Sequence, residues 1–307
     1  MIDILMATYN GEEFIKEQLD SIISQNCTDW RLIISDDCSK DDTVSIIKKY
    51  QERYPDKIIL FENDVPSGSA QNNFFNTIKY TTSDYVMFSD QDDVWLTDKI
   101  EITYNKMMEI ERECGKNTPV LIHTDLKVVD RNLKTINDSF FEMMNMDSKR
   151  CAFNNLLVQN IVTGCTVMGN RALFNYLKKI PQNAVMHDMW IALIASAFGE
   201  IGFVDKSTML YRQHGNNSVG AKDTKSLNYV LEKISNIQKV RNSLAKQYKQ
   251  AEEFREIYKD MLSTLQLDIL ESYSSFGEKS CIEKYRELKR YKLHKKNKLH
   301  VLGQVFV

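Results

Sequence analysis

Three carboxylates stand within four residues at the end of an apolar run, in Ser89-Asp90-Gln91-Asp92-Asp93. Carboxylates this close repel one another unless a cation joins them, and Mg²⁺ or Mn²⁺ is held in proteins by one or two carboxylates plus phosphate oxygens. In an extended segment Asp90 and Asp92 face one pocket, whereas Gln91 and Asp93 face another. The spacing therefore favours a metal and phosphate site, with Asp93 as a cap of the next helix. The alternative is a solvated turn.

Two other predicted strands also end in polar residues, in Thr8-Tyr9-Asn10-Gly11 and in Asp36-Asp37. Ligands of an open parallel sheet bind beyond the carboxyl ends of its strands. The glycine-rich fingerprints that hold dinucleotides or nucleotide phosphates on a helix N-terminus are absent, so a bound diphosphate would need a cation to neutralise it. For Asp36-Asp37 a helix-capping turn remains the alternative.

The elements that position these residues follow an α/β pattern. From residue 1 to about 125, β-branched apolar runs alternate with segments of helical period, which predicts a mostly parallel sheet with flanking helices. A helical face is formed by Ile15, Leu19, Ile22 and Ile23, and Asp41-Asp42-Thr43 predicts the start of a second helix. Strands are predicted over Ile2–Thr8, Arg31–Ser35, Lys57–Phe61, Tyr85–Ser89 and Val120–His123.

Beyond the first half the pattern changes twice. Between about 126 and 222 we expect short strands near Val162–Met168 and Phe203–Leu210 and a helix near Asp188–Ala197. After Gly220 only long polar helices are predicted, over Leu227–Ile234, Val240–Leu270 and Ile282–Leu299. We therefore predict one domain over 1–222, with halves of about 1–125 and 126–222, and a basic helical region over 223–307.

Four motifs, in this order and spacing, resemble those of glycosyltransferase family 2: Ala7-Thr8-Tyr9-Asn10, Ser35-Asp36-Asp37-Cys38-Ser39, Ser89-Asp90-Gln91-Asp92-Asp93-Val94-Trp95 and Met186-His187-Asp188. The resemblance covers about 1–220 and implies the GT-A fold, a Rossmann-like mixed sheet. Within the family the chain looks most like bacterial rhamnosyltransferases of cell-wall or capsular polysaccharide synthesis, through the third motif, Val162-Thr163-Gly164 and Tyr211-Arg212-Gln213-His214.

The resemblance implies roles for the donor side. Asp37 would contact the nucleobase beside Thr8 and Tyr9, and Asp90 would lie near the ribose. Asp92 would hold Mn²⁺ or Mg²⁺, and His214 would contact the metal or diphosphate when the Gly/Asn-rich segment after it closes. A merely structural or exposed histidine is the alternative. The implied donor is dTDP-rhamnose, with a UDP-hexose second.

An inverting transfer needs a base that takes the proton of the acceptor hydroxyl, and the resemblance gives that role to Asp188. From the residues alone, an ordinary helix-capping aspartate is equally compatible. His187 and Trp190 would lie beside it on the acceptor side. Asp125, Thr163 and Gly164 would line the acceptor or sugar, although a solvated strand end and simple packing also explain them.

Composition and charge indicate where the protein acts and which kinds of partner it binds. The six cysteines have no Cys-x-x-Cys spacing and are predicted to be reduced, and the N-terminus lacks a signal sequence, so a cytoplasmic protein is expected. Between Lys284 and Lys298 there are eight Lys or Arg against one Glu. This tail suits an anionic membrane face that carries a lipid-linked saccharide acceptor, or else a solvated helix or dimer contact. No nucleic-acid-reading motif is present.

Two other classes of protein remain compatible with these residues and this fold. A metal-dependent nucleotidyltransferase would employ the same aspartates, although its glycine- and lysine-rich nucleotide loop is missing. A non-catalytic binding subunit would retain the fold and work through its helical tail; it predicts that Asp92→Asn leaves function intact.

Overall fold

The computed structural model describes residues 1–177, 179–215, 237–296, 301 and 304–305, which form two compact units. The first unit comprises Met1–Phe140, Val162–Ile180 and Gly199–Ala221. The second comprises Phe141–Ile161, Pro181–Phe198 and Lys222–Val307. The domain boundary near residue 222 stays a prediction.

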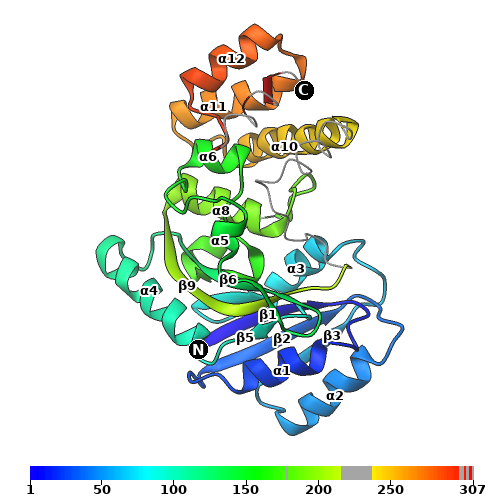
Figure 1. The fold of residues 1–307 in the computed structure, drawn as a ribbon. Helices are drawn as coiled ribbons and strands as arrows, with labels where there is room; N and C mark the ends of the chain where they lie inside the picture. Colours follow the sequence, from blue (N-terminus) through cyan, green and yellow to red (C-terminus); the bar gives the residue numbers. More distant parts are fainter. Residues whose placement is uncertain (178, 216–236, 297–300, 302–303, 306–307) are drawn as a thin grey trace. The chain divides into compact units, whose positions relative to one another are not determined.

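The first unit is built on one mixed sheet (Figure 1). Its strand order is β3-β2-β1-β4-β8-β6-β9-β5. Its first four strands are parallel neighbours: β1 (Ile2–Thr8), β2 (Trp30–Asp36), β3 (Ile58–Glu62) and β4 (Tyr85–Ser89). Two of these, β1 and β4, match the predicted strands residue for residue. Their near-continuous apolar sequences reflect a sheet that is buried on both faces. The predicted α/β class is confirmed.

The second half of the sheet is irregular. The strand β8 (Met168–Asn170) lies antiparallel between β4 and β6 (Val120–Asp130), and β6 runs parallel to β9 (Glu200–Gln213). Two short strands, β5 (Val94–Trp95) and β7 (Thr135–Asn137), pair with β9 and β6. The strand predicted over Val162–Met168 is wrong, because Thr163 and Gly164 accept hydrogen bonds that close the 3₁₀ turn η1 (Gly164–Thr166).

Helices cover both faces of this sheet. The helices α1 (Ile15–Ile23) and α2 (Thr43–Arg53) lie on one side, and α3 (Ala70–Ile78) lies on the other (Figure 1). The predicted apolar face of α1 is confirmed, since Ile15, Leu19 and Ile22 are fully buried. The first unit also contains α4 (Lys99–Cys114) and the short α7 (Arg171–Phe174). The chain leaves it through the single-turn helix α5 (Phe140–Met143).

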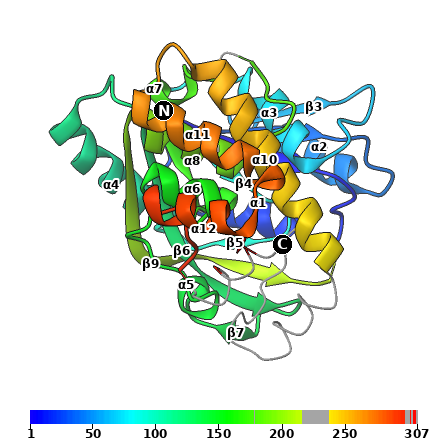
Figure 2. The same ribbon diagram turned by 90° about the horizontal axis from the view of Figure 1, so that it is seen from above.

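Where the structure describes it, the second unit is built of helices, which Figure 2 shows from above. They are α6 (Phe153–Val158), α8 (His187–Phe198), α10 (Ile237–Tyr258), α11 (Thr264–Ser274) and α12 (Cys281–Arg290), with the 3₁₀ turn η2 (Ser275–Glu278). The single helix predicted over Val240–Leu270 is wrong, because Ser263 and Gln266 form a capping box that starts a new helix. The helix predicted over Leu227–Ile234 lies outside the described residues.

The tail helix is shorter than predicted. A capping box of Ser280 and Glu283 starts α12, and the helix ends at Arg290 rather than continuing to Leu299. The last of those residues lie outside the described part of the chain. Among the helices that the structure describes, none has both the length and the apolar character needed to cross a bilayer.

An aromatic cluster holds the second unit together, and its removal is expected to destabilise the protein. Phe254 is fully buried, with its ring centroid 4.6 Å from Tyr258 and 5.2 Å from Trp190. Truncating such a phenylalanine leaves a cavity, so Phe254→Ala should lower the free energy of unfolding by about 3–5 kcal/mol in urea denaturation. Leu265→Ala, at an exposed position of α11, should change it by less than about 0.5 kcal/mol. Equal losses in the two variants would contradict this assignment of the core.

Candidate active site

Three polar strand ends lie side by side at one edge of the sheet. The strands β2, β1 and β4 are consecutive in the sheet, with Thr8 in register with Asp36 and Met6 in register with Ser89. The carboxyl ends of parallel strands meet at the same edge, so the motifs that follow them come together there. The first three motifs therefore lie at the same edge of the sheet.

The first two strand ends are joined by buried hydrogen bonds. Thr8 is 1% exposed, and its hydroxyl donates to the Asp36 carboxylate at 2.8 Å. Ser39 donates to the same carboxylate through its amide and hydroxyl. Asp37 accepts hydrogen bonds from Ser67 N at 2.6 Å, Ser67 Oγ at 2.9 Å and Asn63 Nδ2 at 3.0 Å. The helix-capping interpretation of Asp36-Asp37 is wrong, since Asp42 precedes α2.

Backbone strain marks the same edge. Cys38 has a φ of 65°, and Asn10 has a φ of 45°. Asparagine tolerates this left-handed region, whereas a cysteine there is strained and has to be held by its surroundings. The amide of Asn10 donates to Ser39 Oγ at 2.9 Å, and Asn10 Oδ1 accepts from Lys40 N at 2.8 Å. These bonds fix the two turns against each other.

Gln91 links the first strand end to the aspartate segment. Its Oε1 accepts from Tyr9 N at 2.9 Å, and its Nε2 donates to Tyr9 O at 3.0 Å. Gly11 makes room for this side chain, because a Cβ at Gly11 would lie 2.4 Å from Gln91 Oε1. The Tyr9 side chain remains 57% exposed. This role of Gln91 was not predicted from the sequence, because only the neighbouring Asp90 and Asp92 were given site roles.

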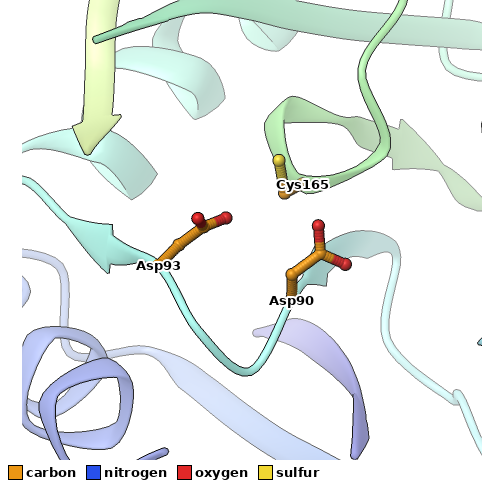
Figure 3. Close-up of side chains that lie close together, drawn as sticks. All are labelled: Asp90, Asp93 and Cys165. Atoms are coloured by element: carbon orange, nitrogen blue, oxygen red, sulfur yellow. The ribbon is translucent and has the colours of Figure 1, made fainter. Parts of the chain in front are cut away.

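The aspartate segment turns back on itself after Asp90. One ligand atom each from Asp90, Asp93 and Cys165 lies within 4.8 Å of the other two (Figure 3). The predicted alternation is wrong, because the chain bends between Ser89 and Val94 instead of remaining extended. Asp93 does not cap a helix either, since α4 starts after Asp98. Burial, followed by the charges of Asp92 and Asp90, raises the pKa of Asp93 well above its usual value.

The side chain of Asp92 lies against that of His214. The His214 Nε2 atom lies 2.7 Å from Asp92 Oδ2, and the two side chains are 10% and 16% exposed. The strand β9 ends one residue before His214, and its pairing with β5 brings this end beside the aspartate segment. The ring of Phe14 lies 4.9 Å from the His214 ring. The Asn-rich segment that follows Gly215 lies outside the described residues.

Arg212 organises this part of the site and was missed in the sequence. Its backbone amide donates to Asp93 Oδ1 at 3.0 Å, and its Nε donates to the Asp92 carbonyl oxygen at 2.8 Å. Its Nη1 donates to the Arg131 carbonyl at 2.6 Å, and its Nη2 pairs with Glu17. The side chain is 2% exposed. This arginine therefore holds the backbone that carries both carboxylates.

The other predicted residues of the first unit have internal partners. Asp125 is 5% exposed, and its carboxylate accepts from Leu126 N at 2.8 Å, Phe140 N at 3.1 Å and the Ser139 hydroxyl. Thr163 and Gly164 belong to the turn η1 and its N-terminal cap. Their acceptor-side roles stay predictions.

Three predicted residues belong to α8 in the second unit. Asp188 lies in the first turn, where its Oδ1 accepts from Met189 N at 2.5 Å and from Asn160 Nδ2 at 3.2 Å. Burial lowers the pKa of His187 to about 3, so its ring is neutral at physiological pH. Trp190 is fully buried in the aromatic cluster, which gives it a packing role. The functional roles of all three stay predictions.

Comparison with solved structures identifies the fold. TarS 1–349 from S. aureus superposes on 90% of this chain and 91% of its own, with a TM-score of 0.57 at 15% identity. The mannosyltransferase PcManGT from Pyrobaculum calidifontis, in complex with GDP-Man and Mn²⁺, has a TM-score of 0.53 at 17% identity, over 99% of this chain and 83% of its own. The fold is therefore the predicted GT-A fold.

Sequence comparison then gives the family. The model of glycosyl transferase family 2 matches residues 3–177. The dTDP-rhamnosyl transferase RfbG of Shigella flexneri is 34% identical over 230 residues, which are 70% of this chain and 74% of that protein. The Escherichia coli UDP-Glc:alpha-D-GlcNAc-diphosphoundecaprenol beta-1,3-glucosyltransferase WfgD is 27% identical over 57% of this chain and 62% of its own. The chain belongs to glycosyltransferase family 2, as predicted, and is a glycosyltransferase.

Proposed function

We propose that this enzyme transfers L-rhamnose from dTDP-rhamnose to a saccharide acceptor, with inversion at the anomeric carbon and with the help of a divalent cation. The observation that carries the proposal is the contact between Asp92 and His214 at the edge of the sheet where three polar strand ends meet. A carboxylate and an imidazole nitrogen that converge at such an edge suit a cation bound together with a diphosphate.

The residues present fit Mn²⁺ or Mg²⁺. Among the described residues no Lys or Arg pairs with the Asp92 carboxylate, whose ionic partner is His214. Asp92 and His214 would hold the ion, which when bound stabilises the negative charge of the departing diphosphate. Arg212 keeps the Asp92 backbone in place, so the carboxylate is positioned before the donor arrives.

The nucleoside would lie along the first two strand ends. Tyr9 offers an exposed ring there, and the Asp37 carboxylate, held by Ser67 and Asn63, would contact the nucleobase. Asp90 would accept hydrogen bonds from the ribose hydroxyls. Thr8 supports this edge from within, because its buried hydroxyl is bonded to Asp36.

Asp188 would accept the proton of the attacking acceptor hydroxyl. The support for this step is the match of Met186-His187-Asp188 to the family pattern. The neutral His187 beside it would help to orient the acceptor. As the hydroxyl oxygen attacks, its proton passes to the Asp188 carboxylate and the bond to the diphosphate breaks on the opposite face of the sugar.

The names of the relatives support two donor classes. The Shigella flexneri relative is a dTDP-rhamnosyl transferase, which favours dTDP-rhamnose for this chain. A UDP-hexose is the second candidate, since WfgD is named for UDP-Glc and TarS has been crystallised with UDP-GlcNAc. A lipid-linked acceptor at the cytoplasmic face of the membrane would suit the basic tail, in which Lys289 and Arg290 end α12.

A panel of nucleotide sugars tests the proposal. Purified enzyme with Mn²⁺ or Mg²⁺ should be protected against thermal unfolding by dTDP-rhamnose, and should slowly hydrolyse it, more than any UDP-hexose. Removal of the cation with a chelator should abolish hydrolysis and weaken the protection. If only a UDP-hexose binds, then the donor is a UDP-hexose and not dTDP-rhamnose. If no nucleotide or nucleotide sugar binds with either metal, the proposed function is wrong.

A further inference from the structure

A thiol lies among the carboxylates of the site, and none of the proposed catalytic steps uses it. Cys165 is 2% exposed and belongs to the turn η1, which the sheet brings against the end of β4. Its Sγ and one oxygen each of Asp90 and Asp93 lie within 4.8 Å of one another (Figure 3). Within the described part of the chain, the carboxylate of Asp92 is not a member of this group.

Asp93 supplies an independent sign of a missing ligand. The residue is fully buried, and its Oδ2 has no hydrogen-bond partner among the described residues, whereas Oδ1 accepts from Arg212 N. A buried carboxylate oxygen without a partner is costly and needs an explanation. The side chain is directed toward the space it shares with Asp90 and Cys165 (Figure 3).

We propose that Asp90, Asp93 and Cys165 form a second cation site, selective for a thiophilic divalent ion such as Zn²⁺ and separate in its ligands from Asp92 and His214. Soft thiolate ligands select Zn²⁺ over Mg²⁺ or Mn²⁺, which prefer oxygen. A tetrahedral zinc ion has ligand bonds of about 2.0–2.3 Å, which place its ligand atoms about 3.3–3.8 Å apart. The three ligand atoms, which lie within 4.8 Å of one another, would move closer together on binding, and the fourth position would be left for water.

The charge balance of the site favours such an ion. Two carboxylates and a thiol are buried or half-buried here, and the nearby buried cation Lys99 is directed to Thr208, with its Nζ 3.3 Å from Thr208 Oγ1. On binding, Cys165 forms a bond from sulfur to the ion and releases its proton to solvent. Because Asp90 is also the proposed ribose contact, an occupied site would compete with the donor; this consequence alone rests on the proposed function.

Cd²⁺ is the probe for a direct test. Thiolate bonds to Cd²⁺ give an ultraviolet charge-transfer absorption that carboxylate and imidazole ligands do not give. Binding of Cd²⁺ to Asp92 and His214 therefore does not contribute to this signal. Metal-free full-length protein, reduced with a phosphine, would be titrated with Cd²⁺ and then with Zn²⁺ or Mg²⁺. We expect one equivalent of absorption that Zn²⁺ displaces and Mg²⁺ does not.

Variants assign the signal to these ligands. Cys165→Ser should lose it, and Asp93→Asn should weaken Cd²⁺ binding by more than about tenfold. Cys114→Ser, at a half-buried cysteine of the same unit, should bind like the wild type. Thermal unfolding without metal checks that each variant is folded, and Zn²⁺ should raise the melting temperature of the wild type more than that of Cys165→Ser.

The proposal is overturned if the wild type shows no thiolate absorption, if Cys165→Ser retains it in full, or if Mg²⁺ displaces the bound Cd²⁺. Donor and acceptor are absent from the titration. A failure of the proposed glycosyl transfer therefore leaves this result unaffected, and a failure here leaves the transfer proposal standing.

Discussion

Asp92→Asn is expected to lower kcat/KM for glycosyl transfer by about 10²–10³-fold, because the amide no longer supplies the negative charge that holds a cation against the leaving diphosphate. The loss should be accompanied by a higher concentration of Mn²⁺ or Mg²⁺ needed for half-maximal rate. Initial rates measured over a series of metal concentrations give both quantities. Asp92 lies 2.7 Å from His214, so His214→Asn should shift the metal dependence in the same direction.

A matched control separates this effect from a general change of charge. Asp138 is 81% exposed and pairs with Lys127 at the surface, so Asp138→Asn removes a carboxylate of the same unit without touching the site. This variant should retain the rate and metal dependence of the wild type. If Asp92→Asn behaves like the control, then Asp92 holds no catalytic cation and the non-catalytic binding alternative gains support.

Asp188→Asn is expected to slow transfer strongly while leaving donor binding unchanged. General-base catalysis contributes about 10²–10⁴-fold, and an amide cannot accept the proton of the acceptor hydroxyl, so kcat should fall by that factor. The dissociation constant of the donor, measured by calorimetry with metal present, should remain that of the wild type. The side chain of Asp188 accepts from Met189 N and Asn160, and the amide oxygen of asparagine can keep these bonds.

The control for this variant lies in the same unit. Asp268 is exposed on α11, and Asp268→Asn should leave kcat unchanged. An unchanged kcat in Asp188→Asn would remove this residue as the base. A loss of donor affinity would give Asp188 a donor-binding role instead, in disagreement with the proposed mechanism.

The parts of the fold that sequence reasoning predicted are those where local pattern and tertiary structure agree. The strands β1 and β4 are buried, mostly apolar runs that end in polar residues, so their limits could be read directly. The convergence of Thr8, Asp37 and Asp92 at one edge follows from the rule for parallel sheets. Their positions needed no knowledge of long-range contacts beyond that rule.

The parts that could not be predicted depend on contacts between distant segments. Cys165 reaches the aspartates because β8 pairs with β4, and a three-residue strand has too little pattern to be recognised. The sequence predicts only that Arg212 belongs to a strand. Its contacts with the aspartate segment depend on the pairing of β9 with β5, which the sequence does not reveal. Asp93 was misassigned because alternation of side chains requires extended backbone, and the chain bends there.

The helices after residue 236 also show where prediction from hydrophobic periodicity fails. Hydrophobic periodicity continues from Val240 to Leu270, but a Ser263–Gln266 capping box interrupts the helix. A capping box inside an amphipathic pattern is a local signal, and it could have been found by searching for serine followed three residues later by glutamine. The packing of Trp190 could not, since its partner Phe254 is distant in sequence.

The position of Arg212 limits how this site can be engineered. Its amide and guanidinium serve the Asp93 carboxylate, the Asp92 and Arg131 carbonyls and Glu17 at once. The aspartate segment therefore cannot be moved to another protein on its own. Transplanted onto another parallel sheet without the end of β9, it would carry two buried acceptors without donors, so loop and strand would have to be exchanged together in a chimeric transferase.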